Sequence, residues 1–151
     1  SSGALFATEL YLVAYRLPDV PPGLWWHDAR TDALVPLAEA PPAPAALGLD
    51  DAPAALVVAT AVFRRSGHKY GDRTYRYVLA DLGHLLENLR AAAAALGVPW
   101  RLARGFDESR LAEALGFDER EEGVLAMCWL YEPGAAPPGG VAAPDAAALA
   151  Q

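Results

Sequence analysis

A stripe of apolar residues in the middle of the chain constrains the fold more than any other sequence feature. Its members recur at three- and four-residue spacing: Val78, Leu82, Leu85, Leu86, Leu89, Ala93 and Leu96. That spacing predicts one long α-helix, from about residue 73 to residue 96, and Gly97 is typical of the position just past a helix end. A helix with a single apolar side needs a second layer to cover it.

The remaining apolar segments predict that this second layer is a sheet. Strands are predicted at residues 10–17, at 54–63 and at 123–133, and a hairpin at 23–37 with its turn at 28–32. The run at 54–63 is apolar without alternation, which favours a strand buried on both faces. The chain is therefore predicted to be an α+β protein with a helix layer packed on a sheet.

Turn and capping residues define the segments between these elements. The proline-rich segment 38–53 predicts a loop with at most one short helix. A second, shorter helix is predicted after Asp107, which can cap it, and before Gly116, which can end it. Residues 133–151 are rich in Pro, Gly and Ala, and this composition is typical of a tail or linker.

Composition excludes several classes of function. A length of 151 residues suits one domain, and the net charge of −7 argues against a general nucleic-acid surface. No apolar run is long enough to span a membrane and no signal peptide is visible, so we expect a cytoplasmic protein. The single cysteine, Cys128, rules out an internal disulfide, and its apolar surroundings predict a buried, inert thiol.

The histidines offer a possible metal site, but the pattern is thin. Asp81, His84 and Asn88 lie at three- and four-residue spacing and share one face of the predicted long helix. His27 and His68 lie in other elements, so too few ligands converge for a metal. We therefore predict no metal, and a hydrogen-bonded histidine at position 84.

The densest polar stretch is "RRSGHKYGDRTYR", at residues 64–76. It places Lys69, the only lysine, beside Tyr70, and its cations precede a helix start, where the helix dipole disfavours positive charge. One interpretation is a solvated loop leading into the helix. The other is a site for an anionic partner or for acid–base chemistry. No phosphate-binding glycine loop or serine nucleophile elbow is present.

Three segments together resemble the SagB-type dehydrogenases, a branch of the FMN-dependent nitroreductase superfamily. They are "SSGALFATELYLVAYRLPDVPPGLWWHDARTDALVPL", "KYGDRTYRYVLADLGHLLENLRAAAAALGVPW" and "GFDESRLAEALGFDEREEGVLAMCWL". The first carries a Ser-Gly turn entering a strand. The second carries a Lys-Tyr pair and a Gly-His before a helix that ends in Ala-Leu-Gly. The resemblance extends from Ser1 to about Glu132.

This resemblance implies a fold, a cofactor and a reaction. It implies a nitroreductase-like sandwich of mostly antiparallel sheet and helices over residues 1–132, with residues 133–151 as a tail. It further implies a homodimer with FMN at the interface that dehydrogenates azoline-like peptide substrates or reduces electron-poor small molecules. On this basis the catalytic residues are Lys69 and Tyr70, and the cofactor-binding residues are Ser1, Ser2 and Gly3.

Two arginines extend the predicted cofactor site. Arg73 and Arg76 lie three residues apart near the helix start. They are candidates to hold the flavin phosphate or a substrate carboxylate, and ion pairs with Asp72 or Asp81 are an alternative. The small residues of the long helix, within 80–97, predict that it forms the dimer interface.

The sequence also departs from the family pattern. Members carry helices with an arginine-rich phosphate-binding motif before the Ser-Gly turn, so we expect an N-terminally truncated domain. The segment "VPWRLARGF" is bulky where the family has small, glycine-rich residues. These departures leave a second hypothesis, a non-catalytic, degenerate domain that acts as a dimerisation or peptide-binding partner.

Overall fold

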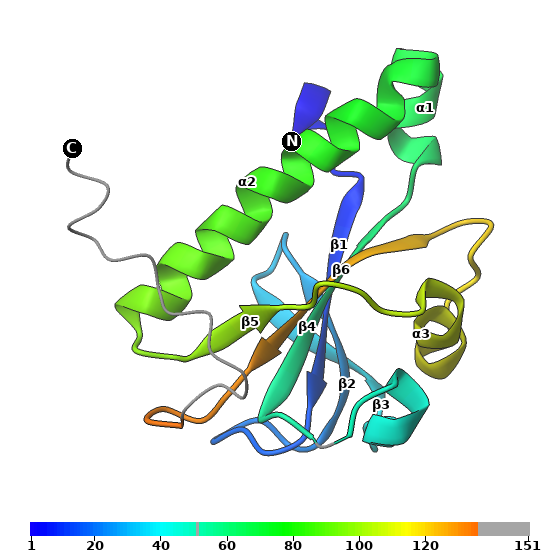
Figure 1. Ribbon diagram of the computed structural model, residues 1–151. Coiled ribbons are helices and arrows are strands. Elements are labelled where there is room, and N and C mark those ends of the chain that lie inside the picture. Colours follow the sequence, from blue (N-terminus) through cyan, green and yellow to red (C-terminus); the bar gives the residue numbers. More distant parts are fainter. Residues whose placement is uncertain (51, 136–151) are drawn as a thin grey trace.

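The computed structural model describes residues 1–50 and 52–135, which form one antiparallel sheet with helices on both of its faces (Figure 1). The strands are β1 (Thr8–Ala14), β2 (Gly23–Asp28), β3 (Ala33–Ala38), β4 (Ala55–Ala61), β5 (Trp100–Leu102) and β6 (Gly123–Leu130). The α-helices are α1 (Arg64–Tyr70), α2 (Thr74–Ala95) and α3 (Glu108–Leu115), and short 3-10 helices are η1 (Ser2–Ala4), η2 (Pro44–Leu47) and η3 (Gly71–Arg73). The predicted α+β class, with an antiparallel sheet packed with helices, is confirmed.

The sheet is built outward from two adjacent central strands. Its order is β3-β2-β1-β4-β6-β5, and every neighbouring pair is antiparallel. β1 and β4 pair along their whole length, from Thr8 opposite Ala61 to Ala14 opposite Ala55. β4 is almost completely buried, which confirms the strand predicted to be covered on both faces.

The two faces of the sheet carry different side chains. One face packs large residues against α3 and η2, namely Tyr11, Val13, Leu24, Leu47, Leu56, Val58, Leu111, Leu115, Val124 and Met127. The face under α2 is built mainly from alanines: Ala7, Ala59, Ala61 and Ala126 meet Val78 and Leu82 of the helix. Small side chains allow the long helix to lie close to the strands.

Several predicted elements are confirmed close to their predicted limits. The long helix is α2, and Gly97 follows it with a φ of +64°. The hairpin is β2–β3, and the proline-rich loop holds only the short η2. In α3, Asp107 caps the helix by accepting a hydrogen bond from Arg110 N–H at 3.0 Å, and Gly116 ends it with a φ of +75°.

Other boundaries differ from the prediction because loop backbone groups end the strands early. β1 stops at Ala14 because the N–H groups of Tyr15 and Arg16 both donate to Ala54 O, at 3.0 and 2.9 Å, which turns the chain away. β6 stops at Leu130, and Tyr131 N–H donates instead to Pro99 O at 2.9 Å. The three-residue β5, within the bulky segment, was not predicted.

The interpretation of residues 64–72 as a loop is wrong. They form α1 and η3, and Gly71, with a φ of +53°, follows α1. The cations at the start of α1 are balanced by acids, since Arg64 pairs with Glu121 at 2.7 Å and Arg65 pairs with Glu9. These partners lie far away in the sequence, so the local pattern could not show them.

Two further predictions concern membrane-spanning segments and the C-terminal tail. Among the described helices, none combines the length and apolar character needed to cross a membrane. The division into a domain at 1–132 and a tail at 133–151 stays a prediction, because residues 136–151 lie outside the described residues.

Candidate functional site

The Lys69–Tyr70 pair lies directly against the turn at the start of the chain. A Cβ atom at Gly3 would overlap Tyr70 Oη and lie 2.8 Å from Lys69 Nζ. Both side-chain tips therefore converge on one point, which glycine leaves free. The structure thus brings Gly3 together with Lys69 and Tyr70, which follow it by more than sixty residues. The sequence analysis placed all three in one site.

The Tyr70 ring is held from two sides. The ring of Tyr77, on α2, lies 4.6 Å from it in a tilted arrangement. Lys69 Nζ lies 5.4 Å from the Tyr70 ring centroid, within the range of a cation–π contact. Lys69 itself is exposed and Tyr70 is partly buried, so both polar tips can reach a bound molecule.

Asp81 anchors the same turn from α2. Its Oδ2 accepts a hydrogen bond from the Ser2 backbone N–H at 2.8 Å, and its Oδ1 accepts one from Ser2 Oγ at 3.0 Å. From the sequence, Asp81 was expected only on a helical face shared with His84 or in an ion pair with Arg73 or Arg76. No local signal could have found this contact, because the partners lie 79 residues apart.

The turn adopts an uncommon backbone conformation. Gly3, Ala4 and Phe6 have φ values of +64°, +56° and +47°. Only glycine adopts this region without strain. The Phe6 N–H donates to Ser1 Oγ at 2.9 Å, so Ser1, which was also predicted to bind the cofactor, helps to hold the turn. Phe6 is left 67% exposed.

A second set of polar contacts joins the turn to α1. Arg65 Nη1 donates to Phe6 O at 2.8 Å and also pairs with Glu9, whose other oxygen accepts from Trp26 Nε1 at 2.8 Å. Arg65 precedes Lys69 by one helical turn. The helix that carries the Lys-Tyr pair is therefore tied to the segment that the pair contacts.

Arg73 and Arg76 lie apart from these contacts. Both are exposed at the N-terminal end of α2, and within residues 1–50 and 52–135 neither forms an ion pair. The alternative of ion pairs with Asp72 or Asp81 is therefore wrong. Whether the arginines hold a phosphate stays a prediction.

A groove of about 480 Å³ extends from the turn along α2. Asp81, His84 and Asn88 line one wall, as their shared helical face predicts, and Leu10 and Val57 of the sheet lie opposite. His84 Nδ1 is 2.8 Å from Ala80 O in the preceding helical turn. No three metal-binding side chains gather anywhere in the described part of the chain.

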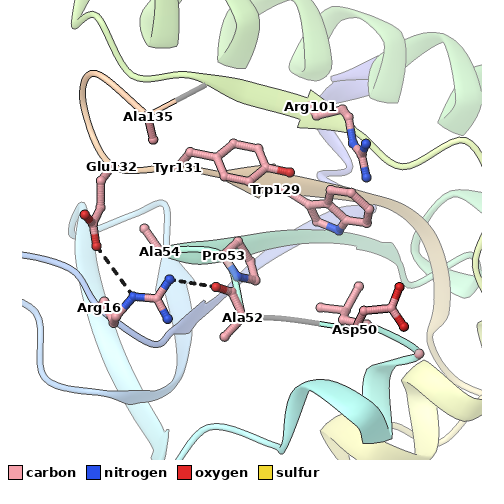
Figure 2. A pocket seen from close by; sticks show the side chains of 12 residues that line it. Arg16, Asp50, Ala52, Pro53, Ala54, Arg101, Trp129, Tyr131, Glu132 and Ala135 are labelled. Carbon is pink, nitrogen blue, oxygen red and sulfur yellow. Dashed lines mark hydrogen bonds and ion pairs between the residues drawn. The ribbon is translucent and has the colours of Figure 1, made fainter. Parts of the chain in front are cut away.

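A larger cavity of about 590 Å³ lies at the N-terminal end of β4 and the C-terminal end of β6 (Figure 2). The Arg101 guanidinium stacks 3.5 Å from the Trp129 ring, and Trp129 Nε1 is buried without a hydrogen-bond partner among the described residues. Arg16 closes one side, donating to Ala52 O at 2.7 Å and lying 3.5 Å from Glu132. The sequence did not predict this cavity.

A partly buried carboxylate, that of Glu122, lies on the face of the sheet that packs against α3. Glu122 Oε1 accepts hydrogen bonds from Tyr11 Oη at 2.8 Å and from Thr60 Oγ1. Burial, followed by the hydrogen bond to Glu122, raises the pKa of Tyr11 well above its usual value. Tyr11 is therefore a fixed hydrogen-bond donor, unlike the accessible Tyr70.

Comparison with known families decides how this arrangement is classified. The model of the nitroreductase family matches residues 1–130. The chain belongs to the nitroreductase family. Members of this family are typically flavin-dependent oxidoreductases that bind FMN, and they are often dimers.

Individual relatives agree with this nitroreductase assignment. A putative nitroreductase of Methanocaldococcus jannaschii is 26% identical over 126 residues, which cover 79% of this chain and 63% of that protein. The crystal structure of a putative nitroreductase from Anabaena variabilis is 32% identical with a TM-score of 0.78, covering 86% of this chain and 28% of that one. The chain thus spans less than two thirds of the length of these relatives.

A more distant structure shares the fold alone. The Escherichia coli microcin synthetase McbBCD complex, with truncated pro-MccB17 bound, matches with a TM-score of 0.75 at 22% identity. The match covers 87% of this nitroreductase chain and 54% of the other.

The residues present fit part of an FMN site. At Gly3 the lack of a side chain lets Tyr70 Oη and the Lys69 ammonium lie directly against the turn backbone. Arg73 and Arg76 are exposed cations without an acidic partner in the described segments, and they suit a phosphate.

Proposed function

We propose that this chain carries the proton-transfer site of an FMN-dependent oxidoreductase of the SagB type. The observation that supports it is the convergence of Lys69 Nζ and Tyr70 Oη on the Gly3 backbone. A surface lysine and tyrosine without a function would not require a glycine of positive φ at the position that their side-chain tips contact. Two side chains held in place for proton transfer would require one.

The proposed reaction removes two hydrogen atoms from an azoline ring in a peptide. Either Tyr70 or Lys69 takes the proton from the ring carbon next to the carbonyl group as the general base, and the other residue of the pair assists it. FMN, when bound, supplies the acceptor for the hydride, that is, for two electrons and the second hydrogen. The lack of a side chain at Gly3 makes room for Tyr70 Oη and Lys69 Nζ against the turn.

A peptide substrate is favoured over a small electron-poor compound by one comparison. The microcin synthetase complex that shares this fold has a peptide, truncated pro-MccB17, bound. The groove beside the turn is lined by apolar and polar side chains in the way that suits a peptide segment. Reduction of a nitroaromatic compound is the second activity to assay.

We further infer that α2 mediates a homodimer with FMN at the interface. The helix exposes Tyr75 by 58% and Leu79 by 38%, and Leu96 just beyond its end by 75%. Arg73 and Arg76 at its start would pair with the FMN phosphate. Solution scattering of the purified protein should give the mass of a dimer, and Arg73→Ala should weaken FMN retention.

The test uses a synthetic peptide containing one thiazoline, with FMN added and oxygen as the final oxidant. Conversion to the thiazole appears in a mass spectrum as the loss of two hydrogen atoms. Tyr70→Phe and Lys69→Ala should each lower kcat by about a hundredfold or more, because a positioned general base contributes that much. Tyr131→Phe is the matched control, since Tyr131 lines the other cavity and not the groove beside the Lys-Tyr pair.

The absorbance of bound flavin separates the possible outcomes. Variants that keep FMN and lose turnover support a role in proton transfer, whereas a Lys69→Ala protein that loses FMN assigns the lysine to cofactor binding. A wild-type protein that stays colourless with added FMN and converts neither probe would favour the non-catalytic, degenerate domain.

A further inference from the structure

The turn that meets the Lys-Tyr pair is not in a relaxed conformation. Two of its three positive-φ residues, Ala4 and Phe6, carry side chains. Strained backbone of this kind persists only where surrounding contacts hold it. The groups that hold the turn therefore determine where Gly3 lies.

Asp81 makes two of those contacts. Both of its carboxylate oxygens are used, one for the Ser2 N–H at 2.8 Å and the other for Ser2 Oγ at 3.0 Å. Hydrogen bonds to an ionised acceptor are stronger than neutral ones, and two of them fix orientation as well as distance. Ser2 is the residue immediately before Gly3.

The other half of the site is held by the same helix. Tyr77 packs on the Tyr70 ring at 4.6 Å, and it precedes Asp81 by four residues, so the two side chains lie on one face of α2. One turn of helix α2 thus contacts both Tyr70 and the Ser2–Gly3 segment opposite it. Rigid helices position functional groups more accurately than loops do.

We propose that Asp81 is a positioning residue, which fixes the Ser2–Gly3 turn against Lys69 and Tyr70. This inference rests on the proposed function, because it assigns Asp81 a part in that same site. Asp81 acts through the turn and transfers no proton itself.

A double-mutant cycle on the full-length protein tests the proposal with the thiazoline peptide. Asp81→Ala should lower kcat by about tenfold or more, with a smaller change in KM, since small displacements of reacting groups cost that much. Asp81→Asn keeps one acceptor oxygen and should lose less. In the Tyr70→Phe background, Asp81→Ala should change kcat by less than about twofold, because coupled residues are not additive.

Glu87→Ala is the matched control. Glu87 lies on the same helix, is exposed, and among the described residues pairs only with Arg90. Its removal should leave kcat unchanged in both backgrounds. Equal losses from Asp81→Ala with and without Tyr70 would overturn the proposal, because Asp81 would then act independently of the pair. Full activity in Asp81→Ala would overturn it as well.

A measurement without turnover separates this inference from the proposed function. By NMR on the flavin-free protein, amide exchange of the Ser2 N–H should accelerate about tenfold or more in Asp81→Ala and stay unchanged in Glu87→Ala. Unchanged exchange in Asp81→Ala would refute the anchoring. If Tyr70→Phe and Lys69→Ala both keep full kcat, the proposed function fails, and the exchange result still decides whether Asp81 holds the turn.

Discussion

The two faces of the sheet are packed in different ways. The face under α3 buries large side chains, and Leu56, Val58, Leu111 and Met127 are each at most 1% exposed. The face under α2 buries mostly alanines and leaves a groove along the helix. Leu79 on that helix remains 38% exposed, and Phe6 beside the groove 67%.

Polar groups divide in the same way. On the α3 face, the Glu122 carboxylate is occupied by Tyr11 and Thr60 and serves the fold. On the α2 face, Asp81 holds a strained turn against Lys69 and Tyr70. The difference indicates that the α3 face supplies most of the stability of the fold, whereas the α2 face carries the chemistry and accepts strain.

The largest expected effect compares a leucine on each face. Leu111→Ala should lower the free energy of unfolding by about 3 kcal/mol, because it removes a fully buried side chain and leaves a cavity. Leu79→Ala, on the exposed side of α2, should cost the fold of a single subunit at most about 0.5 kcal/mol. Urea unfolding of both variants measures this difference, and equal costs would contradict the comparison between the faces.

A comparison of two glycines separates the effect of backbone strain from the effect of contact with the Lys-Tyr pair. Gly3 and Gly97 both have a φ of +64°, but a Cβ atom would meet Tyr70 and Lys69 at Gly3 and nothing within 4 Å at Gly97. Alanine should therefore destabilise both positions by about 1 kcal/mol through the backbone. Only Gly3→Ala should also lower turnover of the thiazoline peptide, by about tenfold or more.

Equal kinetic losses in these two variants would show that backbone strain alone, and not the space at the Lys-Tyr pair, limits the reaction. Thermal unfolding of each variant provides the matching stability values. The pair thus tests the site without changing any of its polar groups.

Sequence patterns predicted the elements that depend on local periodicity or capping. The stripe from Val78 to Leu96 located α2, and Asp107 and Gly116 located α3, because these signals lie within a few residues of the structure they cause. α1 was missed because its seven residues have no apolar period and are held by Glu9, Glu121 and the start of the chain. β5 was missed because three residues are too few to show alternation.

The site could be predicted only in part for the same reason. Lys69, Tyr70 and the Ser-Gly turn were found through a family resemblance, and the contact at Gly3 agrees with grouping them. Asp81 was not assigned to the turn, since a bond across 79 residues leaves no pattern along the chain. Tertiary contacts between distant residues are what a single sequence hides.

A last prediction tests whether the α2 face is closed beneath its groove. Cys128 alternates with Met127 along β6, so it points to the α2 side, where it is 1% exposed. Burial raises the pKa of its thiol from 9.0 to about 11. At pH 8 the thiolate fraction should therefore be about a hundredfold lower than in the unfolded chain.

Labelling with a thiol reagent measures this directly. The native protein should react about a hundredfold more slowly than protein unfolded in guanidinium chloride, and the native rate should rise as the pH approaches 11. Because the folded pKa is the higher one, the contribution of the thiol to stability is complete below pH 9 and declines as the pH rises towards 11. Rapid labelling of the native protein at pH 8 would mean that α2 lifts from the sheet, so that the face carrying the chemistry would be mobile as well as lightly packed.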